Sequence, residues 1–381
     1  MKTIEKKNWI SNFTLIGTPK INDYTFKIDE QSEKSSWIYN SLNLGIDCGE
    51  RCGVVYCELM GGYSDERENV IYVHGKKEDG SDDWSAQLQV DWEDRFDEEI
   101  LETIGDACFI TVGLEKTTKK KTYTKKFLSA YDAIAYIQQY LSEDMVVNVR
   151  GSLKFSEYNG QTQVRKQLNS IVLSKRETPD FTARFTQTIL INSESVNIKN
   201  IDKEKGIVYI NAKVLDYLKE KNGIEYKSQY PYDKQFEFRY PELDEKLVKG
   251  INNLLFKVKR GWTQITLNGE LIEGGAVVTA TWDDVPEAMK QLVTLKVWTK
   301  EQAIAKCSEN SGREQRMVFF EPYTKKGEDD IPEIQSFPER YKDDDLIIDF
   351  DEAEDDEDED VDDINAESSD ASDMSWLDAL K

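Results

Sequence analysis

The stretch MVVNVRGSLKFSEYNGQTQVRKQLNSIVL, residues 145–173, decides the fold because it has the pattern of a long β-hairpin. From Val147 to Phe155, apolar residues and Gly151 alternate with polar ones, so one face of the strand is expected to be buried. Asn159-Gly160 then separates two β stretches. Asn-Gly favours a type I′ hairpin turn, since both positions need φ > 0. We therefore predict two strands joined at this turn.

A helix is predicted directly before this hairpin, from about Ala130 to Leu141, with Ser129 as its cap. A second helix, from about Pro241 to Leu255, precedes FKVKRGWTQITLNGELIEGGAVVTATW, residues 256–282. Both segments that follow a helix contain Arg-Gly and then Asn-Gly, at 150–151 and 159–160 and again at 260–261 and 268–269. This repetition indicates a degenerate internal duplication. Val285 to Cys307 has no counterpart in the first copy and is predicted to be an added helical or mixed element.

Each helix also follows a short strand candidate, Tyr123–Leu128 in the first copy and Phe236–Tyr240 in the second. Strand, helix, strand, turn and strand is the order of the second half of an OB-fold, a five-stranded Greek-key barrel. We predict a mainly β chain with two tandem OB-like barrels, each with a helix between strands 3 and 4. The expected domains are residues 1–175 and 176–327, followed by a disordered acidic tail over 328–381.

The charge is concentrated in that tail. Residues 328–381 hold 24 acidic and three basic side chains, which accounts for −21 of the net −25 and leaves −4 on residues 1–327. A segment so charged and so poor in apolar residues cannot offset the entropy of ordering. Its end carries Trp376, Leu377 and Leu380, which suit one face of a short induced helix and predict a docking peptide for a partner protein.

Binding of single strands needs cations along the phosphates and aromatic faces for the bases. The main candidate is KTTKKKTYTKKF, residues 116–127, where alternation places Tyr123, Lys125 and Phe127 on one face. The first hairpin and the KVKRGW stretch of the second copy add further cations and rings. The full set of predicted DNA-binding residues is Lys116, Lys119, Lys120, Lys121, Tyr123, Lys125, Lys126, Phe127, Arg150, Lys154, Tyr158, Arg165, Lys257, Lys259, Arg260 and Trp262.

The OB-like body with an acidic tail and an apolar tip resembles the single-stranded DNA-binding proteins of bacteria and phages. That resemblance implies a non-enzymatic protein, without a cofactor, that coats and protects single-stranded DNA during replication, recombination and repair. It also implies that the tail recruits replication or recombination proteins and competes with DNA. The bacterial family usually ends in Asp-Ile-Pro-Phe, whereas this chain ends in Trp-Leu-Asp-Ala-Leu-Lys, so a phage protein fits better.

Other functions stay open at this point. The tail could act in a protein-interaction or DNA-mimic protein that binds no DNA. A zinc site could use Cys48, Cys52, Cys57 and His74, although their spacing matches no standard knuckle. A nuclease could hold Mg²⁺ with Asp91, Glu93 and Asp94.

The sequence also bears on compartment. The odd count of five cysteines argues against a disulfide framework. No apolar run reaches 18 residues, and the first residues lack the apolar core of a signal peptide. We expect a cytoplasmic protein, in the host cytoplasm if phage-encoded, with no membrane partner.

Overall fold

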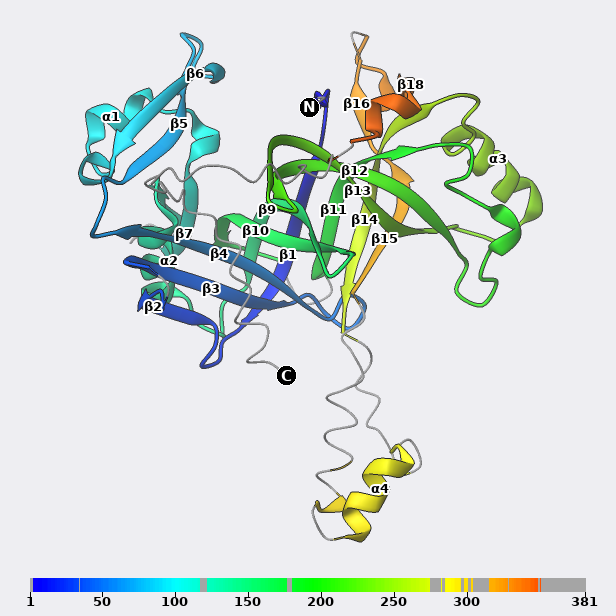
Figure 1. The fold of residues 1–381 in the computed structure, drawn as a ribbon, viewed down its shortest axis with the longest axis horizontal. Coiled ribbons are helices and arrows are strands. Elements are labelled where there is room, and N and C mark those ends of the chain that lie inside the picture. Colours follow the sequence, from blue (N-terminus) through cyan, green and yellow to red (C-terminus); the bar gives the residue numbers. More distant parts are fainter. Residues whose placement is uncertain are drawn as a thin grey trace, which may run out of the picture.

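The computed structural model describes residues 3–33, 35–116, 122–176, 180–274, 282, 285–295, 298–300, 303, 315–327, 329–348 and 350. Fourteen strands form one large sheet that closes on itself twice, so the body consists of two joined barrels (Figure 1).

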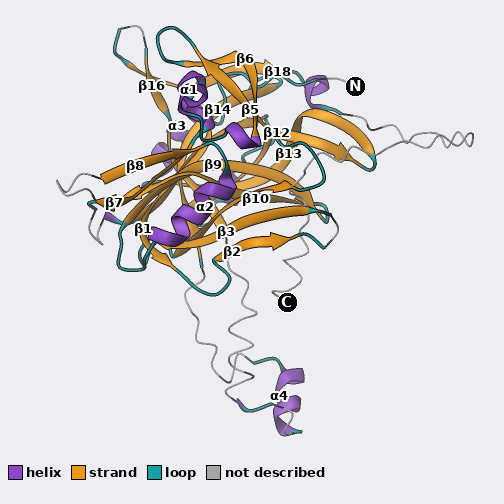
Figure 2. Ribbon diagram, turned by 90° about the vertical axis from the view of Figure 1, so that its left-hand side faces the viewer, coloured by secondary structure: helices purple, strands orange, loops and turns teal. Residues whose placement is uncertain are grey.

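The first barrel follows the OB strand order. Its strands are β1 (Ser11–Lys20), β3 (Trp37–Asp47), β4 (Val54–Ser64), β9 (Val147–Tyr158) and β10 (Gln161–Leu173). They pair in the closed ring β1–β3–β4–β10–β9–β1, in which only β4 and β10 run parallel. Helix α2 (Ala130–Tyr140) lies between strands 3 and 4 of this barrel in the chain and packs against β3 and β4 (Figure 2).

The second barrel repeats the arrangement. Its strands are β11 (Thr182–Ile191), β12 (Ile207–Lys221), β13 (Ile224–Arg239), β14 (Trp262–Glu273) and β15 (Gln315–Pro322). The ring is β11–β12–β13–β15–β14–β11, again with one parallel pair, β13 and β15. Helix α3 (Glu245–Leu255) precedes strand 4, and α4 (Glu287–Thr294) lies in the connection from β14 to β15. The predicted mainly β fold with two OB-like barrels is confirmed.

Both predicted helices form, and their caps explain where they begin. The Ser129 side chain accepts a hydrogen bond from the Tyr131 amide, and α2 buries Ile134 and Ile137, as the apolar spacing predicts. The second helix starts later than Pro241. It begins at Glu245 because Asp244 accepts from two backbone amides of the first turn.

An insertion separates β4 from α2 in the first barrel. It contains β5 (Val70–Lys76), β6 (Asp82–Asp91), α1 (Glu98–Thr103), β7 (Ile110–Lys116) and β8 (Thr122–Phe127). Among the described residues β8 pairs with β7 alone, so the prediction that residues 123–128 form strand 3 is wrong. Strand 3 of the barrel is β4, and the insertion lies between β4 and α2 in the sequence. A short strand, β2 (Phe26–Gln31), extends the sheet beside β3.

The two barrels meet at β1 and β11, which pair antiparallel with Phe13 opposite Phe185. Phe13 also faces Gly151 on β9, and Phe185 faces Gly269 on β14. A side-chain carbon on Gly151 would lie 2.7 Å from the Phe13 ring, and one on Gly269 would lie 2.4 Å from the Phe185 ring. Each glycine therefore makes room for the phenylalanine beside it, and an approximate two-fold axis passes between the two phenylalanines.

This symmetry corrects the predicted match between the copies. Gly151 corresponds to Gly269, which lies inside β14 at a β-bulge rather than in a hairpin turn. The predicted turn at Asn268-Gly269 and the match with Arg260-Gly261 are therefore wrong. The turn at Asn159-Gly160 is confirmed, since both residues have positive φ angles, 48° and 72°.

Part of the segment that was predicted to be a tail is folded, from residue 329 to residue 348. Strand β16 (Thr324–Lys326) pairs with β17 (Pro332–Ile334), and β18 (Ser336–Tyr341) pairs with β14. Tyr341 and Leu346 are buried in a small cluster with Ile4, Leu190 and Leu215. The prediction of disorder is therefore wrong for residues 329–348, where these apolar side chains have a place to pack.

Residues 351–381, including the predicted docking residues Trp376, Leu377 and Leu380, lie outside the described residues. The predicted domain boundaries stay a prediction, since the two barrels share a continuous sheet and one core. No helix in the described part of the chain is long and apolar enough to cross a membrane.

Candidate nucleic-acid interface

The outer face of β3 and β4 carries an aromatic pair. Leu42, Leu44 and Ile46 point into the core, so the strand alternation places Trp37 and Tyr39 outside. Their rings stack with centroids 4.7 Å apart and planes 16° from parallel. We call Trp37 and Tyr39 the aromatic platform. Strands 2 and 3 of an OB-fold, here β3 and β4, form the face that binds oligonucleotides in that architecture.

Polar and cationic groups border this platform. Ser41, next on the same face, pairs with Lys27 of β2 on one side and with Met60 of β4 on the other. Met60 is 38% exposed. Farther along β4, Glu58 lies 3.7 Å from the Arg165 guanidinium of β10. Burial raises the pKa of Glu58, while the nearby Arg165 and Lys166 act in the opposite sense.

The sequence-based candidates omitted Trp37 and Tyr39, although a signal was present. Leu42, Leu44 and Ile46 are apolar at every second position, and the same period assigns residues 37 and 39 to the opposite face. Two aromatic residues on the solvent side of a strand would have marked the platform.

The lysine-rich candidate divides between described and undescribed residues. Lys119, Lys120 and Lys121 lie outside the described residues, and Lys116 ends β7. The ammonium of Lys125 is 5.1 Å from the ring centres of both Phe127 and Tyr136, so this side of β8 faces α2.

The remaining members of that candidate differ in exposure. Phe127 is only 5% exposed and belongs to the core, which leaves its ring unable to stack on a base. Tyr123 is 50% exposed, and Lys126 forms an ion pair with Asp106 at 3.1 Å.

The first-hairpin candidates are accessible. Arg150 and Lys154 project from β9 into solvent, and Tyr158 is 45% exposed beside the turn to β10. This turn connects strands 4 and 5, one of the loops that contact oligonucleotides in OB-folds. Arg165 returns on β10 and reaches the face of the platform through Glu58.

The second-barrel candidates are more constrained. Lys257, Lys259 and Arg260 are exposed in the connection between α3 and β14. The indole N–H of Trp262 donates to Asp343 at 2.8 Å, and its ring packs against the cluster that contains Tyr341. Trp262 therefore holds the C-terminal segment against the barrel.

The matching face of the second barrel differs from the platform. Its outward side chains bond to one another, as Lys213 pairs with Asp233 at 2.7 Å and Arg316 donates to the two carboxylate oxygens of Glu237 from Nε and Nη2. These ion pairs occupy part of this face, which also carries the exposed rings of Tyr209 and Tyr217 on β12.

The cysteines and the histidine do not form the zinc site considered above. Cys48, Cys52 and Cys57 are buried in the barrel core, and burial raises the pKa of each thiol, to about 12 for Cys57. His74 lies in the insertion, where its ring nitrogens are 2.9 Å from Asp82 and 3.2 Å from the Cys108 sulfur. The described residues contain no group of three or more side chains arranged to hold a metal ion, the acidic set at residues 91–94 included.

Comparison with known proteins gives a family and several distantly similar structures. No curated protein sequence matches this chain. Two solved structures that align with it are a deletion mutant and the wild type of the single-stranded DNA-binding protein from Thermus aquaticus. The mutant is 10% identical, with a TM-score of 0.30, and the wild type is 9% identical, with a TM-score of 0.28. Both alignments cover 70% of this chain and 87% of the other, and scores this low support no conclusion about function.

The sequence comparison is more decisive. Residues 77–314, more than half of the chain, match the YorF family, from the insertion in the first barrel to the end of the connection before β15. The chain therefore belongs to the YorF family.

Proposed function

We propose that this protein is a non-enzymatic single-stranded DNA-binding protein whose first barrel holds the strand on the outer face of β3 and β4. The observation that carries the proposal is the stacked Trp37–Tyr39 pair on that face. Every base has a flat face, so aromatic side chains bind single strands with little regard to sequence. The adjoining cations Lys27 and Arg165 suit the phosphates of such a strand.

The cations of the predicted set extend this path. Around the connection from β7 to β8, Lys116 ends β7, Lys119, Lys120 and Lys121 belong to the connection itself, and Lys125 and Lys126 lie in β8; β7 pairs with β10 of the first barrel. Arg150, Lys154, Tyr158 and Tyr123 complete the proposed contacts of the first barrel. Lys257, Lys259 and Arg260 would provide a separate contact in the second.

The acidic C-terminal segment supplies the second half of the proposal. It would compete with DNA for the cationic face and, once displaced, present Trp376, Leu377 and Leu380 to a replication, recombination or repair protein. A tethered competitor acts at high local concentration. The proposed setting is the cytoplasm, where the protein would coat and protect single strands.

The platform can be tested by titrating the full chain with oligo-dT and measuring the quenching of tryptophan fluorescence. Trp37→Ala should weaken binding by about 1–3 kcal/mol, the usual contribution of a stacked base. Tyr217→Ala is the matched control, because Tyr217 is 52% exposed on β12 of the second barrel and should leave the affinity unchanged.

Two results would count against the proposal. Unchanged affinity in the Trp37 variant would remove the platform from the binding site while leaving DNA binding intact. Absence of any oligo-dT binding by the wild-type chain would contradict the function itself and favour the protein-interaction or DNA-mimic alternative.

A further inference from the structure

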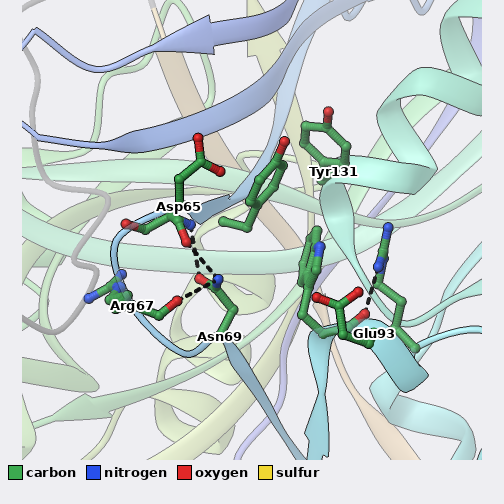
Figure 3. A pocket seen from close by; sticks show the side chains of 9 residues that line it. Asp65, Arg67, Asn69, Glu93 and Tyr131 are labelled. Carbon is green, nitrogen blue, oxygen red and sulfur yellow. Dashed lines mark hydrogen bonds between the residues drawn. The ribbon is translucent and has the colours of Figure 1, made fainter.

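A pocket of about 490 Å³ opens where the end of β4 meets α2 and the insertion (Figure 3). Three rings form one wall: Tyr63 from β4, Trp92 from the short 3₁₀ helix η1 (Trp92–Asp94) and Tyr131 from α2. The Tyr63 ring centre is 5.3 Å from that of Trp92 and 5.5 Å from that of Tyr131. The volume falls within the range of about 300–1,000 Å³ that is usual for small-molecule sites.

Polar contacts hold this wall in place. The Arg95 guanidinium lies 4.2 Å from the Trp92 ring centre, donates to the Trp92 carbonyl oxygen and pairs with Asp132 at 2.8 Å. The Tyr131 hydroxyl donates to Asp29, and burial together with this carboxylate raises the pKa of Tyr131. Arg95 therefore acts as a positioning residue whose charge is already paired.

The spacing of the rings decides how a ligand can lie. A flat ring inserted between Tyr63 and Trp92 would need their centres about 7 Å apart, twice the usual contact distance of about 3.5 Å. They are 5.3 Å apart, so a flat ligand would lie against the wall rather than between its rings.

The rim decides which chemistry suits the pocket. Figure 3 shows Asp65 and Arg67 on the connection from β4 to β5, and Glu93 on the other side of the pocket. The Asn69 side chain is not available to a ligand, because its amide group is already hydrogen-bonded to the backbone of Ser64 and Arg67. Two carboxylates against one guanidinium disfavour a phosphate. Ionised carboxylates only accept hydrogen bonds, so they favour a ligand with an N–H edge.

We propose that this pocket takes one unstacked nucleobase with an exocyclic amino group, guanine best, lying against the Tyr63–Trp92–Tyr131 wall with its N–H edge toward Asp65 or Glu93. Guanine presents two adjacent N–H donors, which match the two oxygens of a carboxylate, whereas thymine presents one N–H between two carbonyls. Unstacked bases are commonly recognised by aromatic stacking and hydrogen bonds along this edge.

The inference rests on the proposed function, because the platform would deliver the strand. Ser64, at the rim of the pocket, is the direct strand partner of Trp37 on β3. Paired residues of antiparallel strands lie about 5 Å apart. A strand that leaves the platform over the end of β4 would therefore meet the rim of the pocket at Ser64 and then turn around that end to reach the Tyr63 ring, which points to the opposite face of β4.

The test compares a 20-nucleotide oligo-dT with the same oligonucleotide carrying one central dG, both titrated into the full chain. The dG oligonucleotide should bind about tenfold more tightly, within the range expected for a two-pronged contact. The double variant Asp65→Asn with Glu93→Gln should lose this preference while binding oligo-dT as before. Glu68→Gln is the matched control on the same connection and should keep the preference.

The outcomes separate the pocket from the platform. Equal affinity for the two oligonucleotides, with oligo-dT binding retained, would overturn the pocket and leave the proposed function standing. If neither oligonucleotide binds, the proposed function fails, and deoxyguanosine monophosphate becomes the probe. Tryptophan quenching by it in the wild type but not in the double variant would support a base site supplied by free nucleotide, and no quenching would overturn the pocket.

Discussion

A buried ion pair joins the two barrels. Lys166 of β10 pairs with Glu273 at the end of β14, and their side chains are only 6% and 3% exposed. Glu273 also accepts a hydrogen bond from the Tyr56 amide at 3.1 Å. Nearby, burial and the charge of Lys166 lower the pKa of Lys234. Both charges at this junction depend on their partner, since neither reaches water.

Glu273→Gln should therefore destabilise the protein by about 3–5 kcal/mol, because it leaves the Lys166 ammonium buried without a counter-charge. Urea unfolding followed by circular dichroism measures this. Glu157→Gln is the control: its pair with Lys221 is partly exposed, so solvent and salt screen it and the loss should be much smaller. The double change Lys166→Met with Glu273→Leu should restore most of the stability, and a Glu273 variant as stable as the Glu157 variant would contradict this role.

Close to the approximate two-fold axis, β9 requires glycine at position 151 because a larger residue would not fit. A side-chain carbon on Gly151 would lie 1.9 Å from the Gln167 carbonyl oxygen as well as against the Phe13 ring. Gly250, in α3, has no heavy atom within 4 Å of such a carbon. The two glycines thus occupy opposite situations, one enclosed and one open.

Gly151→Ala should cost about 3 kcal/mol or more, at or beyond the upper end for overpacking, because the clash is with backbone. Gly250→Ala should stabilise the protein by about 0.5–1 kcal/mol, since alanine loses less conformational entropy in a helix. Thermal unfolding of the two variants under the same conditions checks both signs. A Gly151 variant that melts at the wild-type temperature would show that β10 can shift to accommodate a methyl group.

At the level of elements, local patterns predicted well where they were strong. The α2 cap and apolar face, and the turn at Asn159-Gly160, are properties of a few neighbouring residues, and all are confirmed. The role of β8 was predicted wrongly, because strand order depends on pairing between distant segments. For the same reason the pairing of β1 with β11, in which Ser11 lies opposite Gln187, was not predicted.

For the whole molecule, sequence gave the barrel type but not how the barrels are joined. Alternation identifies strands and their faces, yet no local pattern states that β1 pairs with β11. The candidate site shows the same division. The hairpin cations could be listed from composition, whereas the pocket combines Tyr63, Trp92 and Tyr131 from three separate segments and could not be foreseen.

The β1–β11 pairing has a consequence for either barrel taken alone. β1 of the first barrel and β11 of the second cover an edge of each other that would be unpaired in a single barrel. An unpaired strand edge tends to pair with a strand of another chain. In a fragment of residues 1–176, β1 should find that neighbour in a second copy of itself, with Phe13 opposite Phe13 where Phe185 stands in the intact chain. We expect this fragment to be a symmetric dimer by sedimentation equilibrium, and a monomer at tens of micromolar would contradict it. The intact chain would then be, in effect, a tethered version of such a dimer in which the two halves have been free to diverge.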